Sequence, residues 1–157
     1  MKIFLDTEFL DADDDIHLLS LGMVREDGKT YYAELHECDR SLANEWVKLN
    51  VFPHLTGPVK FKSQVCRDLL DFCGEEAEFW AYGIPDLDYN LVMRLFMWTI
   101  PKGWSRGAFD VCSGKGHNGS FYLPPTQTTI PPTQTTIPHH ALNDALWAKE
   151  IYDESQF

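Results

Sequence analysis

The chain has 157 residues, which is typical of one domain with a substantial core and is short for two. Its apolar fraction of 44% is that of a folded globular protein, which excludes a disordered tail. With 13 basic and 24 acidic residues, the net charge of −11 argues against a protein held on nucleic acid or membranes by general electrostatics, although bound divalent metals can reverse the field locally.

The chain opens with a short apolar run, Ile3 to Leu5, which predicts a buried strand that ends in Asp6-Thr7-Glu8. Because residues i and i+2 of a strand share a face, the carboxylates of Asp6 and Glu8 are expected to converge. Two adjacent anions repel each other, and a bound cation is the usual reason for such a pair. An acidic strand end without a ligand is the alternative interpretation.

Three strands are predicted at the start of the chain. After the first strand, the acidic run at 11–15 predicts a solvated turn. Residues 16–24 are strongly apolar, and an Asp27-Gly28 turn signal separates them from a further strand at 30–35. Together the three strands are expected to form an antiparallel meander.

The middle of the chain alternates between helical and extended patterns. Ser41 is expected to cap a helix that passes through Leu49 and ends near Pro53, and a loop follows at 54–60. The pattern then predicts a helix at 63–72 that ends at Gly74, a buried strand at 77–82, a helix at 88–98 and a short edge strand at 108–111. This order predicts an α/β fold: a mixed central sheet, with the meander and parallel strands, flanked by helices.

A tandem repeat precedes the last helix. Residues 124–130 read PPTQTTI, residues 131–137 repeat them, and Pro138 follows. The Pro-Pro pairs exclude a helix or a central strand, so 124–138 is predicted to be an extended surface loop within a single domain that spans 1–157. Residues 139–152 are then predicted to form an amphipathic helix, and its buried positions are expected to be Leu142, Ala145, Leu146, Ala148 and Ile151.

Four acidic residues each stand where an element ends near, or faces, the sheet: Asp6, Glu8, Asp88 and Asp144. If they meet at one site without a basic partner, they require cations, and hard oxygen ligands select Mg²⁺ or Mn²⁺. His139 lies five residues before Asp144, at the mouth of the last helix. From there it can reach the site as a proton acceptor for a water molecule.

These residues resemble the three exonuclease motifs of the DEDDh, or DnaQ-like, 3′–5′ exonucleases of the ribonuclease H-like fold. The matching motifs are Asp6-Thr7-Glu8, an Asp at a helix start after a strand, and H-x-A-L-x-D-A from His139 to Ala145. They span essentially the whole chain in the family's order. The opening DTEF, the Tyr-Tyr-Ala at 31–33 and the W-A-Y at 80–82 are most similar to small bacterial and phage-type 3′–5′ exoribonucleases.

The resemblance implies a catalytic site with two Mg²⁺ (or Mn²⁺) ions held by four carboxylates, Asp6, Glu8, Asp88 and Asp144. It assigns His139 as the general base of a reaction that releases nucleoside 5′-monophosphates from the 3′ end of single-stranded RNA. Phe9 and Thr7 are assigned to substrate binding, with Phe9 placed to stack on the 3′-terminal base. A core position is the alternative for Phe9.

Several alternatives remain open. Asp86 could replace Asp88 as the third carboxylate, although Leu91 and Leu95 follow Asp88 at helical spacing. His140 adjoins His139, and the family spacing favours His139. Single-stranded DNA is an alternative substrate, and a catalytically inactive nucleic-acid-binding module is an alternative class.

The cysteines and the start of the chain bear on location. None of the four cysteines forms a CxxC pair, which fits a reducing compartment. The start lacks a basic segment followed by a long apolar core, and no apolar run approaches membrane-spanning length. We therefore expect a cytoplasmic protein without a membrane partner. Related nucleases are often dimers, so a homodimer is a further expectation.

Overall fold

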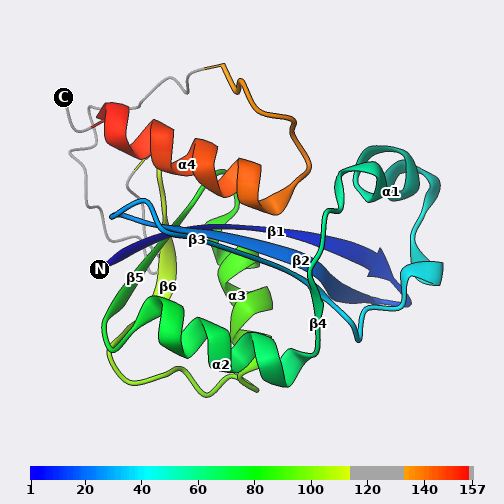
Figure 1. The fold of residues 1–157 in the computed structure, drawn as a ribbon, viewed down its shortest axis with the longest axis horizontal. Coiled ribbons are helices and arrows are strands. Elements are labelled where there is room, and N and C mark those ends of the chain that lie inside the picture. The colour runs from blue at the N-terminus through cyan, green and yellow to red at the C-terminus, as the bar shows by residue number, and fades with distance from the viewer. Residues whose placement is uncertain (114–132, 156–157) are drawn as a thin grey trace.

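The structure, a computed structural model, describes residues 1–113 and 133–155. In this part of the chain a six-stranded sheet is covered on one face by α4 (Ala141–Ser155) and on the other by α2 (Lys62–Cys73) and α3 (Pro85–Leu95), as Figure 1 shows. The short helix α1 (Glu45–Asn50) lies at one end of the sheet, beside the start of α4. Residues 124–132 of the predicted repeat loop lie outside the described residues.

The strand order of the sheet is β4-β3-β2-β1-β5-β6. Its strands are β1 (Lys2–Ala12), β2 (Asp15–Arg25), β3 (Thr30–Leu35), β4 (Val59–Lys60), β5 (Ala77–Ala81) and β6 (Trp104–Asp110). Strands β1, β2 and β3 pair antiparallel, whereas β4, β5 and β6 join the sheet through parallel pairs. The predicted α/β class, with a mixed sheet flanked by helices, is confirmed and is consistent with a ribonuclease H-like fold.

Strand β1 is longer than the sequence pattern predicted. It continues to Ala12, so Asp6, Thr7 and Glu8 lie inside the strand and do not end it. The turn to β2 consists of Asp13 and Asp14, whose φ angles of 53° and 59° lie in the left-handed region. A two-residue hairpin turn of type I′ requires positive φ angles at both residues, and aspartate tolerates them better than most residues. Asp6 and Glu8 therefore lie within the paired part of the β1–β2 hairpin, opposite Gly22 and Ser20.

Each predicted helix is present in the structure, but the first and last residues of the helices differ from the predicted ones. Asn44 caps α1 by accepting a hydrogen bond from the amide of Val47, whereas Ser41 lies in a separate 3₁₀ turn, Arg40–Leu42, so the predicted cap was wrong. A second 3₁₀ turn, Phe52–His54, follows α1. Helix α3 begins at Pro85, three residues earlier than predicted, because a proline in the first turn needs no hydrogen-bond acceptor.

Three further boundaries differ. Helix α3 ends at Leu95, and Met97 and Trp98 then take positive φ angles that a helix cannot continue through. The predicted loop at 54–60 contains β4, whose two residues are too few to produce a periodic pattern. The predicted edge strand at 108–111 corresponds to the end of β6, which begins earlier, at Trp104, ends at Asp110 and lies at one edge of the sheet.

The two faces of β1 serve two different parts of the core. Ile3 and Leu5 pack toward α2 and α3, whereas Phe4 packs toward α4 with Trp80. Since side chains alternate along a strand, Asp6 and Glu8 share the face of Phe4 and point to the α4 side. On α4, Ala145, Ala148 and Ile151 are buried as predicted, but Leu146 is 38% exposed and Ala141 is buried in addition. Helix α4 therefore lies directly above the two acidic residues.

Gly22 allows this close approach. It pairs with Asp6 across β1 and β2, and a Cβ atom at Gly22 would lie 2.3 Å from the backbone of Ala141 at the start of α4. We predict that Gly22→Ala lowers the free energy of unfolding by about 3 kcal/mol, the upper range for overpacking, because backbone atoms cannot move aside. Chemical denaturation measures this change.

Gly28→Ala is the matched control for that substitution. A Cβ atom at Gly28 would meet nothing within 4 Å, and the only cost is its left-handed φ of 85°, about 1 kcal/mol. An equal or smaller loss at Gly22 would contradict the close contact.

Within residues 1–113 and 133–155, no helix has the length and apolar character that crossing a bilayer requires.

Candidate metal centre

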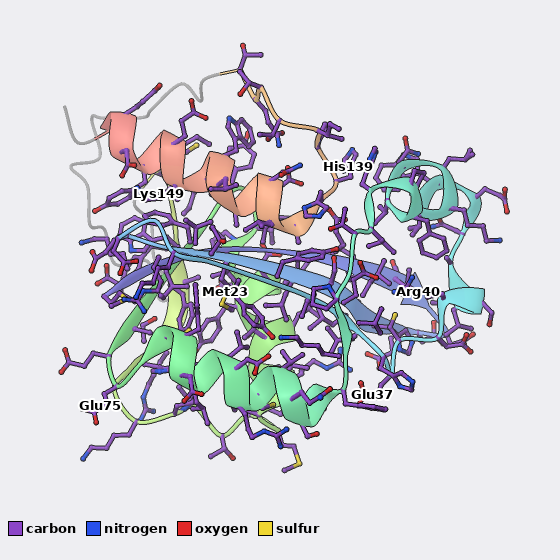
Figure 2. All side chains as sticks on the ribbon, in the orientation of Figure 1. Met23, Glu37, Arg40, Glu75, His139 and Lys149 are labelled. Atoms are coloured by element: carbon purple, nitrogen blue, oxygen red, sulfur yellow. The ribbon has the colours of Figure 1, made fainter. Side chains whose placement is uncertain are left out.

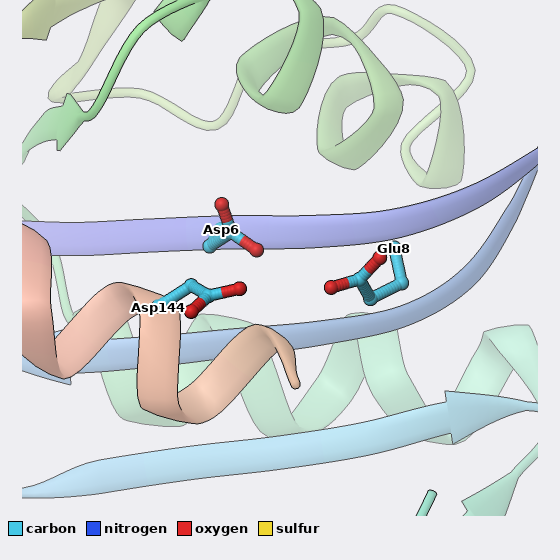
Figure 3. Close-up of side chains that lie close together, drawn as sticks. All are labelled: Asp6, Glu8 and Asp144. Carbon is cyan, nitrogen blue, oxygen red and sulfur yellow. The ribbon is translucent and has the colours of Figure 1, made fainter. Parts of the chain in front are cut away.

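Three carboxylates from opposite ends of the chain meet between β1 and α4. Each of Asp6, Glu8 and Asp144 offers one oxygen, and these oxygens all lie within 4.8 Å of one another. Figure 3 shows the three side chains converging, with Asp6 and Glu8 on the strand and Asp144 on the first turn of the helix. All three are half-buried. The period-two alternation predicted the first pair, and the Gly22 contact with Ala141 brings the third residue over them.

The carboxylate of Asp144 is oriented by two donors from the segment before α4. The amide of His139 donates a hydrogen bond of 3.0 Å to its Oδ2 atom, and the side-chain amide of Gln134 donates to its Oδ1 atom. The amide of Asp144 itself donates to the carbonyl of His140 at 3.1 Å, which begins the helix. The position of Asp144 therefore depends on how the chain enters α4.

Asp88 lies beside this cluster and is bound to the strand between Asp6 and Glu8. It is 7% exposed, and its Oδ1 atom accepts hydrogen bonds from the amide and the hydroxyl of Thr7, at 3.1 and 2.5 Å. Strand β5 pairs with β1 only from Lys2 to Phe4. Beyond that point, the amide of Thr7 in β1 donates to the Asp88 carboxylate where it would otherwise face a neighbouring strand. Asp88 is not among the residues whose oxygens come within 4.8 Å of one another.

Asp86, the alternative third carboxylate, is exposed in the first turn of α3. The burial of Asp88 and its contact with β1 therefore favour Asp88.

The electrostatics of the cluster are those of crowded, partly desolvated acids. Burial raises the pKa of Asp6 well above its usual range, and the charges of Asp88, Asp144 and Glu8 add to the rise. Burial together with the Asp144 and Asp88 charges raises the pKa of Glu8 to about 8. These carboxylates therefore bind protons at neutral pH more readily than ordinary ones do, and a cation would relieve the repulsion between their charges.

The pKa values of Asp88 and Asp144 are also raised, but hydrogen bonds that these carboxylates accept oppose the rise. Burial raises the pKa of Asp88 to about 7, although the hydrogen bonds from Thr7 oppose the rise. Burial also raises the pKa of Asp144, against the hydrogen bonds from Gln134 and His139. An all-carboxylate donor set with this charge distribution fits a hard divalent cation.

The two histidines before α4 have different surroundings. The ring of His139 meets the ring of Trp46 edge-on, with centroids 5.0 Å apart, and Figure 2 shows His139 on the side of α4 that faces α1. The ring of His140 stacks on Tyr32 at 4.4 Å. His139 has a φ of 61°, which is unfavourable for a residue other than glycine, so its neighbours must hold this conformation.

Comparison with known proteins bears on the class of enzyme. Two curated relatives are 3′–5′ exoribonucleases of Mycobacterium tuberculosis, one from strain CDC 1551 / Oshkosh and one from strain ATCC 25618 / H37Rv. Each is 37% identical to this chain over 90 residues, which cover 52% of this chain and 54% of the relative. The chain is similar to 3′–5′ exoribonucleases. It spans about half the length of these relatives, and it matches no model of a known protein family.

The two residues assigned to substrate binding differ in exposure. Thr7 is 5% exposed and its hydroxyl is bound to Asp88, so the structure gives it a part in orienting that carboxylate. Phe9 is half-buried and pairs with Leu18, just after the register of β1 and β2 shifts between Glu8 and Phe9. A role in substrate binding stays a prediction for both residues.

Sequence reasoning missed two residues near the site. Gln134 belongs to the second PPTQTTI heptad, which the pattern indicated only as a surface loop, yet it donates to Asp144. Trp46 was expected in a helix, but its 53% exposure and its contact with His139 depend on where α1 lies. The spacing to Asp144 singled out His139, but nothing in the sequence indicated that Trp46 would contact it.

Proposed function

We propose that the protein is a metal-dependent 3′–5′ exonuclease of the DEDDh type that removes nucleoside 5′-monophosphates from the 3′ end of single-stranded RNA. The observation that carries the proposal is the cluster of Asp6, Glu8 and Asp144, whose oxygens lie within 4.8 Å of one another. The similarity to relatives named 3′–5′ exoribonucleases supports the polarity and the choice of RNA.

The donor set suits two Mg²⁺ or Mn²⁺ ions, which Asp6, Glu8 and Asp144 would hold together with Asp88. Such ions would supply positive charge that stabilises the attacking and leaving oxygens of an in-line displacement at the scissile phosphate. Thr7 keeps Asp88 oriented through its two hydrogen bonds. A module that only bound nucleic acid would gain nothing from four mutually repelling acids, which argues against the inactive alternative.

His139 is the proposed general base, which takes a proton from the attacking water on an imidazole nitrogen. Its backbone amide holds Asp144, so the base and a carboxylate ligand are fixed to each other. Trp46, exposed beside the His139 ring, offers a flat apolar surface on which a nucleobase can stack. Stacking of this kind is sequence-tolerant, as an exonuclease that degrades any sequence requires.

We expect a labelled single-stranded RNA to shorten progressively from its 3′ end when Mg²⁺ or Mn²⁺ is present, with products that carry 5′-phosphates. Denaturing gels and mass spectrometry measure both properties, and EDTA should stop the reaction. A matched DNA strand should be degraded more slowly. Faster degradation of DNA would favour the alternative substrate, and no shortening of either strand under any divalent metal would refute the proposal.

Two expectations accompany this proposal. Cys38, Cys66, Cys73 and Cys112 are free thiols, which is compatible with a cytoplasmic location. Assembly as a homodimer stays a prediction, which size-exclusion chromatography with light scattering would test.

A further inference from the structure

The ring of His140 is held on two sides. It stacks on Tyr32 of β3, with the centroids 4.4 Å apart and the planes 20° from parallel. Its Nε2 atom lies 3.1 Å from the hydroxyl oxygen of Thr56, at hydrogen-bond distance. Its buried Nδ1 atom has no hydrogen-bond partner among the described residues. Thr56 therefore supplies the hydrogen bond that fixes the ring, and Tyr32 supplies the surface on which it rests.

Both partners of His140 are tied to one buried carboxylate. Glu34 is 2% exposed and accepts hydrogen bonds from the amide of Gly57 at 2.5 Å and from the hydroxyl of Tyr32 at 3.3 Å. Arg40 neutralises it through a 2.5 Å ion pair. The amide of Glu34 also donates to the carbonyl of Pro58 at 2.9 Å. The loop that presents Thr56 is thus attached to β3, and Figure 1 shows this segment passing beside the start of α4.

The position of His140 sets the position of its neighbours. Its carbonyl accepts the first hydrogen bond of α4, from the amide of Asp144, and the preceding amide, of His139, binds the Asp144 carboxylate. The positive φ of His139 is unfavourable unless the residues on either side hold it. The tethered ring of His140 provides this support on the helix side.

We propose that His140 is a positioning residue: its imidazole, fixed by Thr56 and Tyr32 and through them by Glu34, holds His139 and Asp144 in place at the metal centre. The proposal rests on the function proposed above. It gives the second histidine a role distinct from that of the general base, because its ring nitrogen binds a loop of the protein and is not offered to substrate.

Thr56→Val tests this role with little risk to the fold, since Thr56 is exposed and valine has the same shape without the hydroxyl. We expect the affinity for Mn²⁺, titrated calorimetrically without RNA, to fall about tenfold, as it does when groups that orient metal ligands are removed. Amide hydrogen exchange at His139 and Asp144 should become faster in the metal-free protein. Thr56→Ser, which keeps the hydroxyl, should restore both properties.

Two controls show whether Thr56 acts through His140. His140→Phe keeps the stacked ring but removes the nitrogen, and in that background Thr56→Val should have no further effect. Thr99→Val, at an exposed threonine after α3, should leave Mn²⁺ affinity and exchange unchanged. Unchanged exchange and affinity in Thr56→Val would overturn the proposal, and so would additive losses in the double variant.

The wild-type measurements separate this proposal from the proposed function. A wild-type protein that degrades no RNA refutes the exonuclease function, whereas the exchange rates in the Thr56 variants still decide whether His140 holds the segment. Normal RNA degradation by Thr56→Val, with unchanged exchange, would refute the positioning role and leave the exonuclease function standing.

Discussion

Asp6→Asn should reduce the kcat for RNA hydrolysis by about a thousandfold or more, the upper range for removing one group that stabilises transition-state charge. The neutral amide keeps the size of the side chain but is a poor ligand for a divalent cation. The same substitution should raise the melting temperature of the metal-free protein by a few degrees. It removes a half-buried acid whose pKa is raised by desolvation and by three neighbouring carboxylates.

The combination of lost activity and gained stability is the distinctive result, because loss of activity through misfolding would lower the melting temperature. Asp86→Asn is the matched control, since Asp86 is an exposed aspartate in the first turn of α3. It should keep wild-type activity, whereas Asp88→Asn should lose it. Loss of activity in Asp86→Asn with normal activity in Asp88→Asn would reverse the choice of the third carboxylate.

The stability of the metal-free protein should fall as pH rises from about 5.5 to 8.5, above the range in which ordinary carboxyl groups titrate. The folded protein holds protons on Glu8 and Asp88, with pKa values of about 8 and about 7, that the unfolded chain has already released. The folded state therefore binds more protons than the unfolded state, and the slope of stability against pH is negative. The loss across this window should be on the order of a few kcal/mol.

Saturating Mn²⁺ should remove most of this pH dependence, because the cation takes the place of the protons and stabilises the folded state by mass action. Urea unfolding at several pH values, with EDTA or with MnCl₂, measures both effects. Burial lowers the pKa of His140, which contributes a slope of the opposite sign, so a variant comparison is needed to isolate the carboxylates.

Glu8→Gln should flatten the curve of the metal-free protein, whereas Glu26→Gln, at an exposed position after β2, should not. Stability that rises with pH in EDTA would contradict the raised pKa values.

The part of the site that the sequence predicted depends on short-range geometry. Alternation along β1 places Asp6 and Glu8 on one face whatever the rest of the chain does, and the spacing from His139 to Asp144 covers only the entry to one helix. The choice between Asp86 and Asp88 also followed from helical spacing, and the burial of Asp88 agrees with it. The metal and catalytic roles of these residues stay predictions.

What the sequence did not predict depends on contacts between distant segments. Strand β4 has two residues, and it exists because β3 offers an open edge, which no local pattern reveals. The cap at Asn44 rather than Ser41 depends on where the chain turns after β3. Gln134 carries no charge and lies in a repeat without periodicity, so its bond to Asp144 could be found only from the fold.

The cluster joins a strand near the start of the chain to a helix near its end, which has a consequence during synthesis. A nascent chain in which α4 has not yet been translated carries Asp6 and Glu8 but lacks Asp144, and it also lacks the helix that covers them. If the proposed function holds, such a chain is inert toward the messenger RNA from which it is being translated. Prematurely terminated products would be inert for the same reason, so hydrolytic activity would appear only after translation of α4.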